Sequence, residues 1–304
     1  MKLNYGIATL YNPPIVPDAI QRFLFEHAPV RGEIVHLEET WRTVLAHQAY
    51  PPCVRALLGE MMAAAALLTA TLKFGGTLIM QIQGTGPLSL VVVECTSRHR
   101  MRATAKWSAV PESGTLAELV GSGRFGITLD PGAGRSSYQS IVAIEGETIA
   151  AALEQYMLRS EQIDTRLWLS ADERRAAGLL LQKLPEREGN DADAWRRAIT
   201  IASTLAADEI IAHDAPELLR RLYSTEDIRV FAARQVQFHC SCSRERVAAM
   251  LRMLGQEEVR SIIAERGTVD VNCEFCSHRY SFTPGDVTSL FPMAQATPSS
   301  ATRH

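Results

Sequence analysis

Hydrophobic residues recur along this chain at two different spacings, and each spacing predicts a different kind of element. The clearest helical pattern places apolar residues three and four positions apart, at Val54, Leu57, Leu58, Met61, Met62, Ala65, Leu68 and Leu72. Gly75 and Gly76 follow this run and are expected to end the helix. The alanines within it would let the helix pack closely against a sheet.

Alternation of apolar and polar residues dominates the rest of the first 185 residues and predicts strands. The expected strands are 30–37, 77–83, 88–95, 100–108, 124–130, 137–145, 165–169 and 178–184. Helices are expected around Trp41, over 116–120 and 149–157, and from a cap at Asp18 to His27. Strands in runs with inserted helices, rather than in regular alternation, favour an α+β domain over residues 18–185. Residues 1–17 hold three prolines and are expected to be a mobile extension.

The composition changes after Pro185. Residues 186–235 contain 17 charged residues in 50, or 34% against 21% for the whole chain. Apolar residues persist at helical spacing at Trp195, Ile199, Ala202, Ala206 and Ile210, and Asp214-Ala215-Pro216-Glu217 is a favourable helix start. This stretch is therefore predicted to be a charged, amphipathic helical linker that docks weakly on a neighbouring domain and can come away from it.

A second, smaller domain is predicted over residues 236–292, followed by a disordered tail at 293–304. Ser243 can cap a helix that ends at Gly255, a second helix is expected to end at Gly267, and residues 279–282 resemble a return strand. Fewer than sixty residues with few large apolar side chains form a marginal domain unless a metal or disulfides support it.

Four of the six cysteines lie in two close pairs in this small domain. Cys240 and Cys242 form a C-x-C pair, and Cys273 and Cys276 form a C-x-x-C pair thirty residues later. A strand-like run precedes each pair, so two turns could present four thiolates to one tetrahedral zinc ion. The spacing therefore predicts one Zn²⁺ bound by Cys240, Cys242, Cys273 and Cys276, with His239 and His278 as bystanders. Cys53 and Cys95 stand alone at core-like positions.

The same spacing leaves open what the zinc does. Four-cysteine sites are most often purely structural. A bond between Cys240 and Cys242, however, would close a very small ring, and strained disulfides are easily reduced again. A reversible redox switch and a permanent structural site are both compatible with the pattern.

Charge and length exclude several classes of protein. The net charge of −3 and the isoelectric point near 6.3 provide no chain-wide basic field for nucleic acid. The N-terminus lacks the apolar core of a signal peptide, and the apolar run at 61–72 is shorter than a membrane span needs. A cytoplasmic location without membrane association is expected, where paired cysteines bind metal or react with oxidants rather than form permanent disulfides. Gly121 to Gly126 matches G-x-G-x-x-G, but it follows a helix and opens a strand, so no dinucleotide site is expected.

No catalytic constellation emerges from the chain, and an enzyme is not expected. Two alternatives remain beside a zinc-dependent redox switch. A nucleic-acid-binding zinc ribbon would need a basic stripe that residues 236–292 lack. A thiol oxidoreductase would place its C-x-x-C at a helix start, whereas strand-like segments flank Cys273 and Cys276.

The whole pattern resembles the 33-kilodalton heat shock protein family of redox-regulated chaperones. The resemblance rests on Cys240 to Arg246 with Cys273 to Cys276, and it runs from about Asp18 to about Leu290. In the first domain it is carried by Phe25-Glu26-His27, Val30-Arg31-Gly32-Glu33, Leu67 to Phe74, Gln83 to Pro87 and Tyr156 to Gln162.

This resemblance implies a function. Family members are ATP-independent holdases that are inactive while reduced and zinc-bound. Oxidation is then expected to join Cys240 to Cys242 and Cys273 to Cys276, release zinc and unfold the zinc domain and linker. The resemblance further implies dimerisation and the holding of unfolding client proteins, without nucleic acid or membrane partners.

Overall fold

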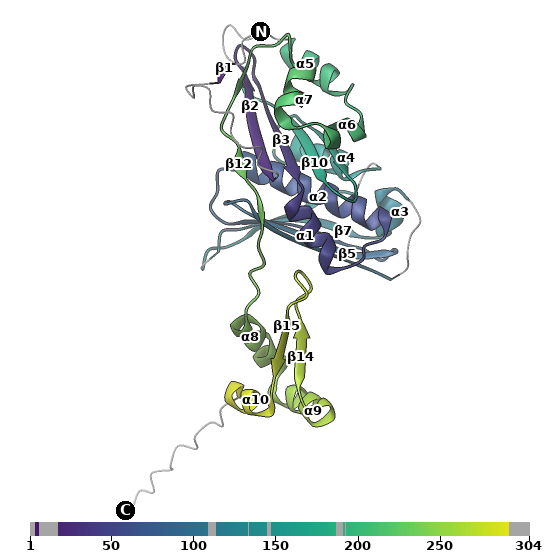
Figure 1. Cartoon of the computed structure of the whole chain (residues 1–304), viewed down its shortest axis with the longest axis vertical. Coiled ribbons are helices and arrows are strands. Elements are labelled where there is room, and N and C mark those ends of the chain that lie inside the picture. Colours follow the sequence, from purple (N-terminus) through teal and green to yellow (C-terminus); the bar gives the residue numbers. More distant parts are fainter. Residues whose placement is uncertain are drawn as a thin grey trace, which may run out of the picture. The chain divides into compact units, whose positions relative to one another are not determined.

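The computed structural model describes residues 4–5, 18–108, 114–132, 134–144, 147–186, 191 and 193–291, with only the backbone of residues 4–5. The chain divides into two compact units, Met1–His239 and Cys240–His304 (Figure 1). Both helices and strands build the molecule, which confirms the predicted α+β class. The second unit begins four residues after the predicted start at 236, because Val236 is buried in the core of the first unit.

One sheet of the first unit has seven strands in the order β1-β11-β2-β3-β10-β9, with β12 also paired to β2. Their bounds are β1 (Asn4–Tyr5), β2 (Ala19–Phe25), β3 (Val30–Leu37), β9 (Thr165–Ala171), β10 (Ala176–Lys183), β11 (Ile228–Val230) and β12 (Arg234–Gln235). Apart from β1, the predicted extension 1–17 lies outside the described residues. Within the described chain, β9 is an edge strand of this sheet.

The other sheet of the first unit has six strands in the order β13-β6-β5-β4-β7-β8. They are β4 (Thr77–Gln83), β5 (Leu88–Thr96), β6 (Arg100–Trp107), β7 (Arg124–Asp130), β8 (Tyr138–Val142) and β13 (Gln237–Phe238). The predicted hairpin of β4 and β5 is present. The glycine motif follows α3 (Leu116–Val120) and leads into β7, the order of elements that the sequence predicted.

Helix α2 (Pro52–Thr71) packs against strands of both sheets. Contact on both sides explains why it is apolar around most of its circumference. Two glycines permit the close approach: a Cβ on Gly59 would lie 2.4 Å from the Ala171 side chain, and one on Gly178 would lie 2.8 Å from Leu67. At 20 residues, α2 is long and apolar enough to cross a membrane, but 72% of its apolar window is buried within the fold. It is the central core helix.

The helix predicted from Asp18 to His27 is wrong, because this segment forms β2. Its apolar spacing fits either element, and pairing with β3 and β12 decides the outcome. Asp18 caps a different helix instead: its carboxylate accepts hydrogen bonds from the N–H groups of Glu39 at 3.0 Å and Thr40 at 2.6 Å, at the start of α1 (Glu39–His47). The predicted helix over 149–157 is α4 (Ile149–Arg159).

Three helices of the charged stretch 186–235 cover the opposite face of the seven-stranded sheet from α2. They are α5 (Ala194–Ala202), α6 (Ala207–Ala212) and α7 (Ala215–Leu222). The single apolar stripe predicted from Trp195 to Ile210 is interrupted, since α5 ends before Ala206. Asp214 caps α7 as predicted, accepting a 2.8 Å hydrogen bond from the N–H of Glu217.

The stretch between α7 and the first cysteine pair follows both sheets. β11 and β12 pair with β2, and β13 then pairs with β6. Arg234 reaches the buried Glu33 carboxylate at 3.3 Å, and burial raises the pKa of Glu33 to about 7. These three short strands were not predicted from the sequence, except for the strand-like character of 236–239.

The second unit contains α8 (Arg244–Leu254), α9 (Gln256–Arg266), β14 (Val269–Asn272), β15 (Arg279–Phe282) and α10 (Pro284–Leu290). Ser243 caps α8 by accepting a hydrogen bond from the N–H of Arg246, and Gly267 ends α9 with a φ of 78°, as predicted. Its described core is small and consists of Ala248, Leu251, Val259, Val269, Phe282 and Val287.

Candidate metal centre

The four paired cysteines converge at one place in the second unit. Cys240 and Cys242 precede α8, and Cys273 and Cys276 lie in the turn between β14 and β15. All four Sγ atoms lie within 4.8 Å of one another, and all four residues are half-buried. The structure therefore brings together every cysteine that the sequence assigned to a metal.

Two sulfur–sulfur distances are close to the edge length of a tetrahedron around zinc. The Sγ atoms of Cys240 and Cys273 are 3.6 Å apart, and those of Cys242 and Cys276 are 3.4 Å apart. Four sulfurs at ~2.3 Å from a tetrahedral zinc ion would be separated by ~3.8 Å. Both short contacts join one close pair to the other. The cluster is thus one four-sulfur site and not two separate dithiols.

The turn that carries Cys273 and Cys276 is fixed by backbone hydrogen bonds. The N–H of Cys273 donates to the carbonyl of His278 at 2.9 Å, and the N–H of Ser277 donates to the carbonyl of Cys273 at 2.8 Å. Ser277 takes a left-handed conformation, with a φ of 55°, to close the turn. The antiparallel pairing of β14 and β15 then holds both sulfurs on the side of the first pair.

Hydrogen-bond donors surround the sulfurs in the way that thiolates require. Backbone N–H groups of Phe275 and Cys276 face the Cys273 sulfur and favour its charged form. Burial opposes them and raises the pKa of both the Cys273 and the Cys276 thiol. A divalent cation would reverse this balance, because a coordinating thiol is deprotonated by the metal charge. The donors therefore favour thiolates that a metal holds.

Tyr280 was not anticipated from the sequence, yet its hydroxyl donates to the Cys242 sulfur at 3.1 Å. Hydrogen bonds to metal ligands orient them and tune the site. The pKa of Tyr280 is raised to about 12, chiefly through this contact. The sequence signal was indirect: Tyr280 belongs to the predicted return strand, but only the register of β14 and β15 brings it toward the cysteines.

Two arginines of α8 connect this helix to the residues around the sulfur cluster. Arg244 lies 4.2 Å from the ring centroid of Phe282 and forms a 3.1 Å ion pair with Asp286, which ties α8 to β15 and α10. Arg246 donates to the hydroxyl of Ser241 at 2.6 Å, between the first two cysteines. These contacts fix α8, and with it Cys242, against the rest of the second unit.

The other sequence candidates lie outside the cluster. Neither His239 nor His278 belongs to the group of possible ligands: the backbone N–H of His239 donates to the backbone carbonyl of Met101 in the first unit, and the His278 ring packs edge-on against Tyr280. Cys95 is buried in the core of the first unit, where burial raises its thiol pKa to about 12. Cys53 is half-buried against the same core.

The donor set fits zinc. Four sulfurs within 4.8 Å of one another, with N–H and O–H donors facing them, make a closed site of the kind that structural zinc takes. Bound there, zinc would supply the cross-link between the two halves of the second unit. With four protein sulfurs it would keep no open position for a substrate.

Comparison with known proteins gives consistent results. The model of the Hsp33 protein family matches residues 18–283. The 33 kDa chaperonin of Methylobacillus flagellatus is 50% identical over 291 residues, covering 95% of this chain and 99% of that protein. The 33 kDa chaperonin of Chromobacterium violaceum is 48% identical, covering 90% of this chain and 94% of that protein.

The fold agrees as well. The crystal structure of the 33 kDa chaperonin of Thermotoga maritima superposes with a TM-score of 0.77, covering 90% of this chain and 97% of that one, at 22% sequence identity. None of these relatives supports the alternative of a nucleic-acid-binding zinc ribbon. The family match covers most of the chain, and the relatives match nearly their full length, so this protein belongs to the Hsp33 family of chaperones.

Proposed function

We propose that this protein is a redox-regulated, ATP-independent holdase that binds unfolding proteins and prevents their aggregation under oxidative stress. One observation carries the proposal most strongly. The only cross-link available to the small second unit, among the described residues, is a cluster of four sulfurs within 4.8 Å. A metal held by thiolates is a bond that oxidants can break.

Loss of the metal should unfold the second unit. Six buried apolar residues are too few to stabilise a unit of this size by themselves. Structural zinc contributes on the order of 10–16 kcal/mol of binding free energy, much of which is folding free energy. We propose that Zn²⁺ bound to Cys240, Cys242, Cys273 and Cys276 supplies this stability in the reduced, inactive state.

The redox step requires two oxidations. For each one, two zinc-bound thiolates lose two electrons to an oxidant such as a hydroperoxide, which takes up two protons from solvent and is reduced to water and an alcohol or to two waters. The proposed products are the disulfides Cys240–Cys242 and Cys273–Cys276, with Zn²⁺ released to solution. The four sulfurs are close enough that disulfide formation needs little chain movement.

The helices α5, α6 and α7 determine what unfolding would expose. Apolar residues of these helices bury one face of the seven-stranded sheet, including Phe23, Phe25, Ile34, Leu179 and Leu181. The chain leaves this layer through β11, β12 and β13 and enters the second unit directly at Cys240. In the proposed mechanism, unfolding spreads backward through this stretch, and the uncovered sheet face binds apolar client segments.

The remaining parts of the proposal follow the family resemblance. Clients are unfolding proteins, the oxidised form is a homodimer, and the location is the cytoplasm. The bound zinc is regulatory, so the protein is proposed to act by binding and not by catalysis, without nucleic acid or membrane partners.

The test follows zinc, thiols and client aggregation in one sample. Reduced protein is treated with peroxide under mild heat, released zinc is measured with a chelating dye, and remaining thiols are counted. Light scattering of a thermally unfolding client is recorded in parallel. We expect release of one zinc and loss of four thiols per chain, together with suppressed scattering. Zinc release without suppression, or suppression by the fully reduced protein, would overturn the proposal.

A further inference from the structure

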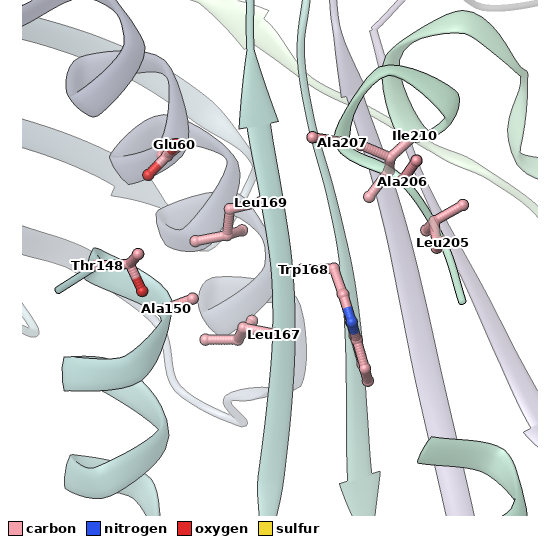
Figure 2. A pocket seen from close by; sticks show the side chains of 10 residues that line it. All are labelled: Glu60, Thr148, Ala150, Leu167, Trp168, Leu169, Leu205, Ala206, Ala207 and Ile210. Atoms are coloured by element: carbon pink, nitrogen blue, oxygen red, sulfur yellow. The ribbon is translucent and has the colours of Figure 1, made fainter. Parts of the chain in front are cut away.

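A cavity of about 230 Å³ lies at the edge of the seven-stranded sheet, where α2, the start of α4, β9 and α6 meet (Figure 2). Leu167 and Leu169 point to the side of α2 and α4, and Trp168 points to the side of α6. Its lining is mostly apolar and comprises Glu60, Thr148, Ala150, Leu167, Trp168, Leu169, Leu205, Ala206, Ala207 and Ile210. We call this cavity the β9 groove.

One wall of the β9 groove is the edge strand β9, whose outer backbone N–H and C=O groups do not pair with another strand among the described residues. Within the described residues β9 pairs only with β10. The N–H of Leu167 points away from β10, since it donates to the Glu154 carboxylate at 2.7 Å. Backbone groups two residues apart in a strand face the same side, so the N–H and C=O of Leu169 also face the open edge. An extended peptide could hydrogen-bond there.

Glu60 places a carboxylate in this apolar groove, where it has no hydrogen-bond or ion-pair partner among the described residues. Burial raises its pKa to about 7, and no charged group or hydrogen bond opposes that shift. Among the described residues, two other carboxylates have raised pKa values, and each has compensation: Glu33 faces Arg234, and Glu154 faces Arg166. The buried Glu60 carboxylate thus destabilises the folded state, and no interaction among the described residues offsets this cost. Such destabilising residues are typical of functional sites.

We propose that the β9 groove binds an extended client segment whose backbone adds to β9 and whose lysine or arginine side chain pairs with Glu60. The carboxylate selects a cation, and Leu167 and Leu169, on the same side of β9 as Glu60, accommodate the aliphatic stem of that cation. Strand addition supplies affinity from the backbone, and the groove supplies the preference for a side chain. This inference rests on the proposed holdase function and gives that function a residue-level site.

The stretch 205–210 connects the β9 groove to the redox switch. Leu205, Ala206, Ala207 and Ile210 form one wall and belong to the segment that the proposed mechanism undocks. The opposite wall belongs to α2, α4 and β9, which remain in the core. Undocking therefore widens the groove and leaves Glu60 in place.

The experiment compares two labelled peptides on the oxidised, full-length protein. Both are extended and apolar, and they differ only in one central residue, lysine or glutamine. Fluorescence anisotropy gives the dissociation constants for the wild type, for Glu60→Gln, and for Glu147→Gln as a control at an exposed carboxylate beside the groove. Exchange of the β9 amides is followed with and without peptide.

We expect the wild type and Glu147→Gln to prefer the lysine peptide on the order of fivefold, a ratio typical of one partly buried charge pair. Glu60→Gln should bind both peptides like the wild type binds the glutamine peptide, and exchange of the Leu169 amide should slow on binding. Equal affinities in the wild type, or a preference that survives in Glu60→Gln, would overturn the inference. Light scattering of a client recorded on the same samples distinguishes the holdase function from peptide binding at the β9 groove. If scattering is suppressed but the lysine peptide is not preferred, only the proposal for the β9 groove is rejected.

Discussion

The two units of this protein are stabilised in different ways. The first unit buries α2 between two sheets and closes the outer face of one sheet with α5, α6 and α7. The second unit has six buried apolar residues among those described and one cluster of four sulfurs. Burial of apolar surface is insensitive to oxidants, whereas thiolate coordination is destroyed by them. In the proposed mechanism, one chain therefore combines a unit that oxidants leave folded with a unit that they unfold.

The helices α5, α6 and α7 are intermediate between the apolar core of the first unit and the metal-dependent second unit. They are charged outside and apolar inside, and they bury Trp195, Leu218 and Tyr223 against the sheet. Tyr223 also donates its hydroxyl to the carbonyl of Ala198 at 3.1 Å, within this layer. The sequence predicted weak docking; the observed contacts include fully buried side chains. Their release must therefore be driven, and the proposed driving force is the collapse of the second unit.

Removal of one sulfur should have the largest effect. Cys273→Ser is expected to abolish zinc binding and to unfold the second unit, because the lost metal contributes on the order of 10 kcal/mol. Zinc content and trypsin cleavage at Arg252 and Arg260 would be measured. Cys53→Ser, in the first unit, should retain one zinc per chain. A protease-resistant second unit in Cys273→Ser would contradict the contrast between the two units.

A substitution that weakens the packing of α7 should test whether client binding depends on undocking of the helices or on loss of the metal. Leu218 is 1% exposed, so Leu218→Ala is expected to destabilise the helical layer by about 3 kcal/mol. Client scattering should then be suppressed in part under reducing conditions, while zinc remains bound. The control is Arg220→Ala, at an exposed position on the same helix. If Leu218→Ala holds clients only after zinc is lost, docking of α7 does not limit activity.

Glu60 should give the first unit a characteristic pH dependence. Its folded pKa of about 7 lies above the ordinary value of 4.5, so the folded state keeps a proton that the unfolded chain releases. Stability from this group therefore falls as the pH rises from about 4.5 to 7. Glu60→Gln removes that loss and should gain on the order of 3 kcal/mol at pH 8 and less than about 1 kcal/mol at pH 5.

Urea unfolding followed by tryptophan fluorescence measures this gain, since all four tryptophans lie in the first unit. The wild type and Glu147→Gln, measured at the same two pH values, are the references. A gain of equal size at pH 5 and pH 8 would show that the effect does not come from ionisation of the carboxylate.

The smallest expected effect concerns the cap of α8. Ser243→Ala removes a hydrogen bond to the N–H of Arg246 and should cost the second unit about 1 kcal/mol. Because folding and zinc binding are coupled, this corresponds to roughly fivefold weaker retention of zinc in competition with a chelator. Ser289→Ala, at an exposed position of α10, is the matched control. Unchanged retention in Ser243→Ala would indicate that the site is preformed without α8.

Local signals in the sequence were sufficient for much of this structure. The apolar periodicity of α2, the hairpin of β4 and β5, and the caps at Ser243 and Asp214 depend on neighbouring residues only. The four paired cysteines can likewise be recognised from the sequence without knowledge of the fold. Such features can be predicted because few other local structures are compatible with the same residues.

Features that depend on distant partners were predicted poorly. Ile20 and Phe23 fit a helix as well as a strand, and only pairing with β3 and β12 decides for β2. Strands of two or three residues, such as β11 and β12, carry too little pattern to be seen. Glu60 looks like an ordinary polar position within α2, and nothing nearby in the sequence shows that it lines a cavity together with residues of β9 and α6.

Hydrogen exchange measured before and after oxidation tests the central claim most directly, namely that loss of the metal spreads to α5, α6 and α7 but not to the core. Exchange is compared for three segments of the same sample: 244–290, 194–222 and α2. Oxidation is predicted to abolish protection in 244–290 and 194–222 while α2 stays protected. Retained protection in 194–222 after zinc has left would contradict the account.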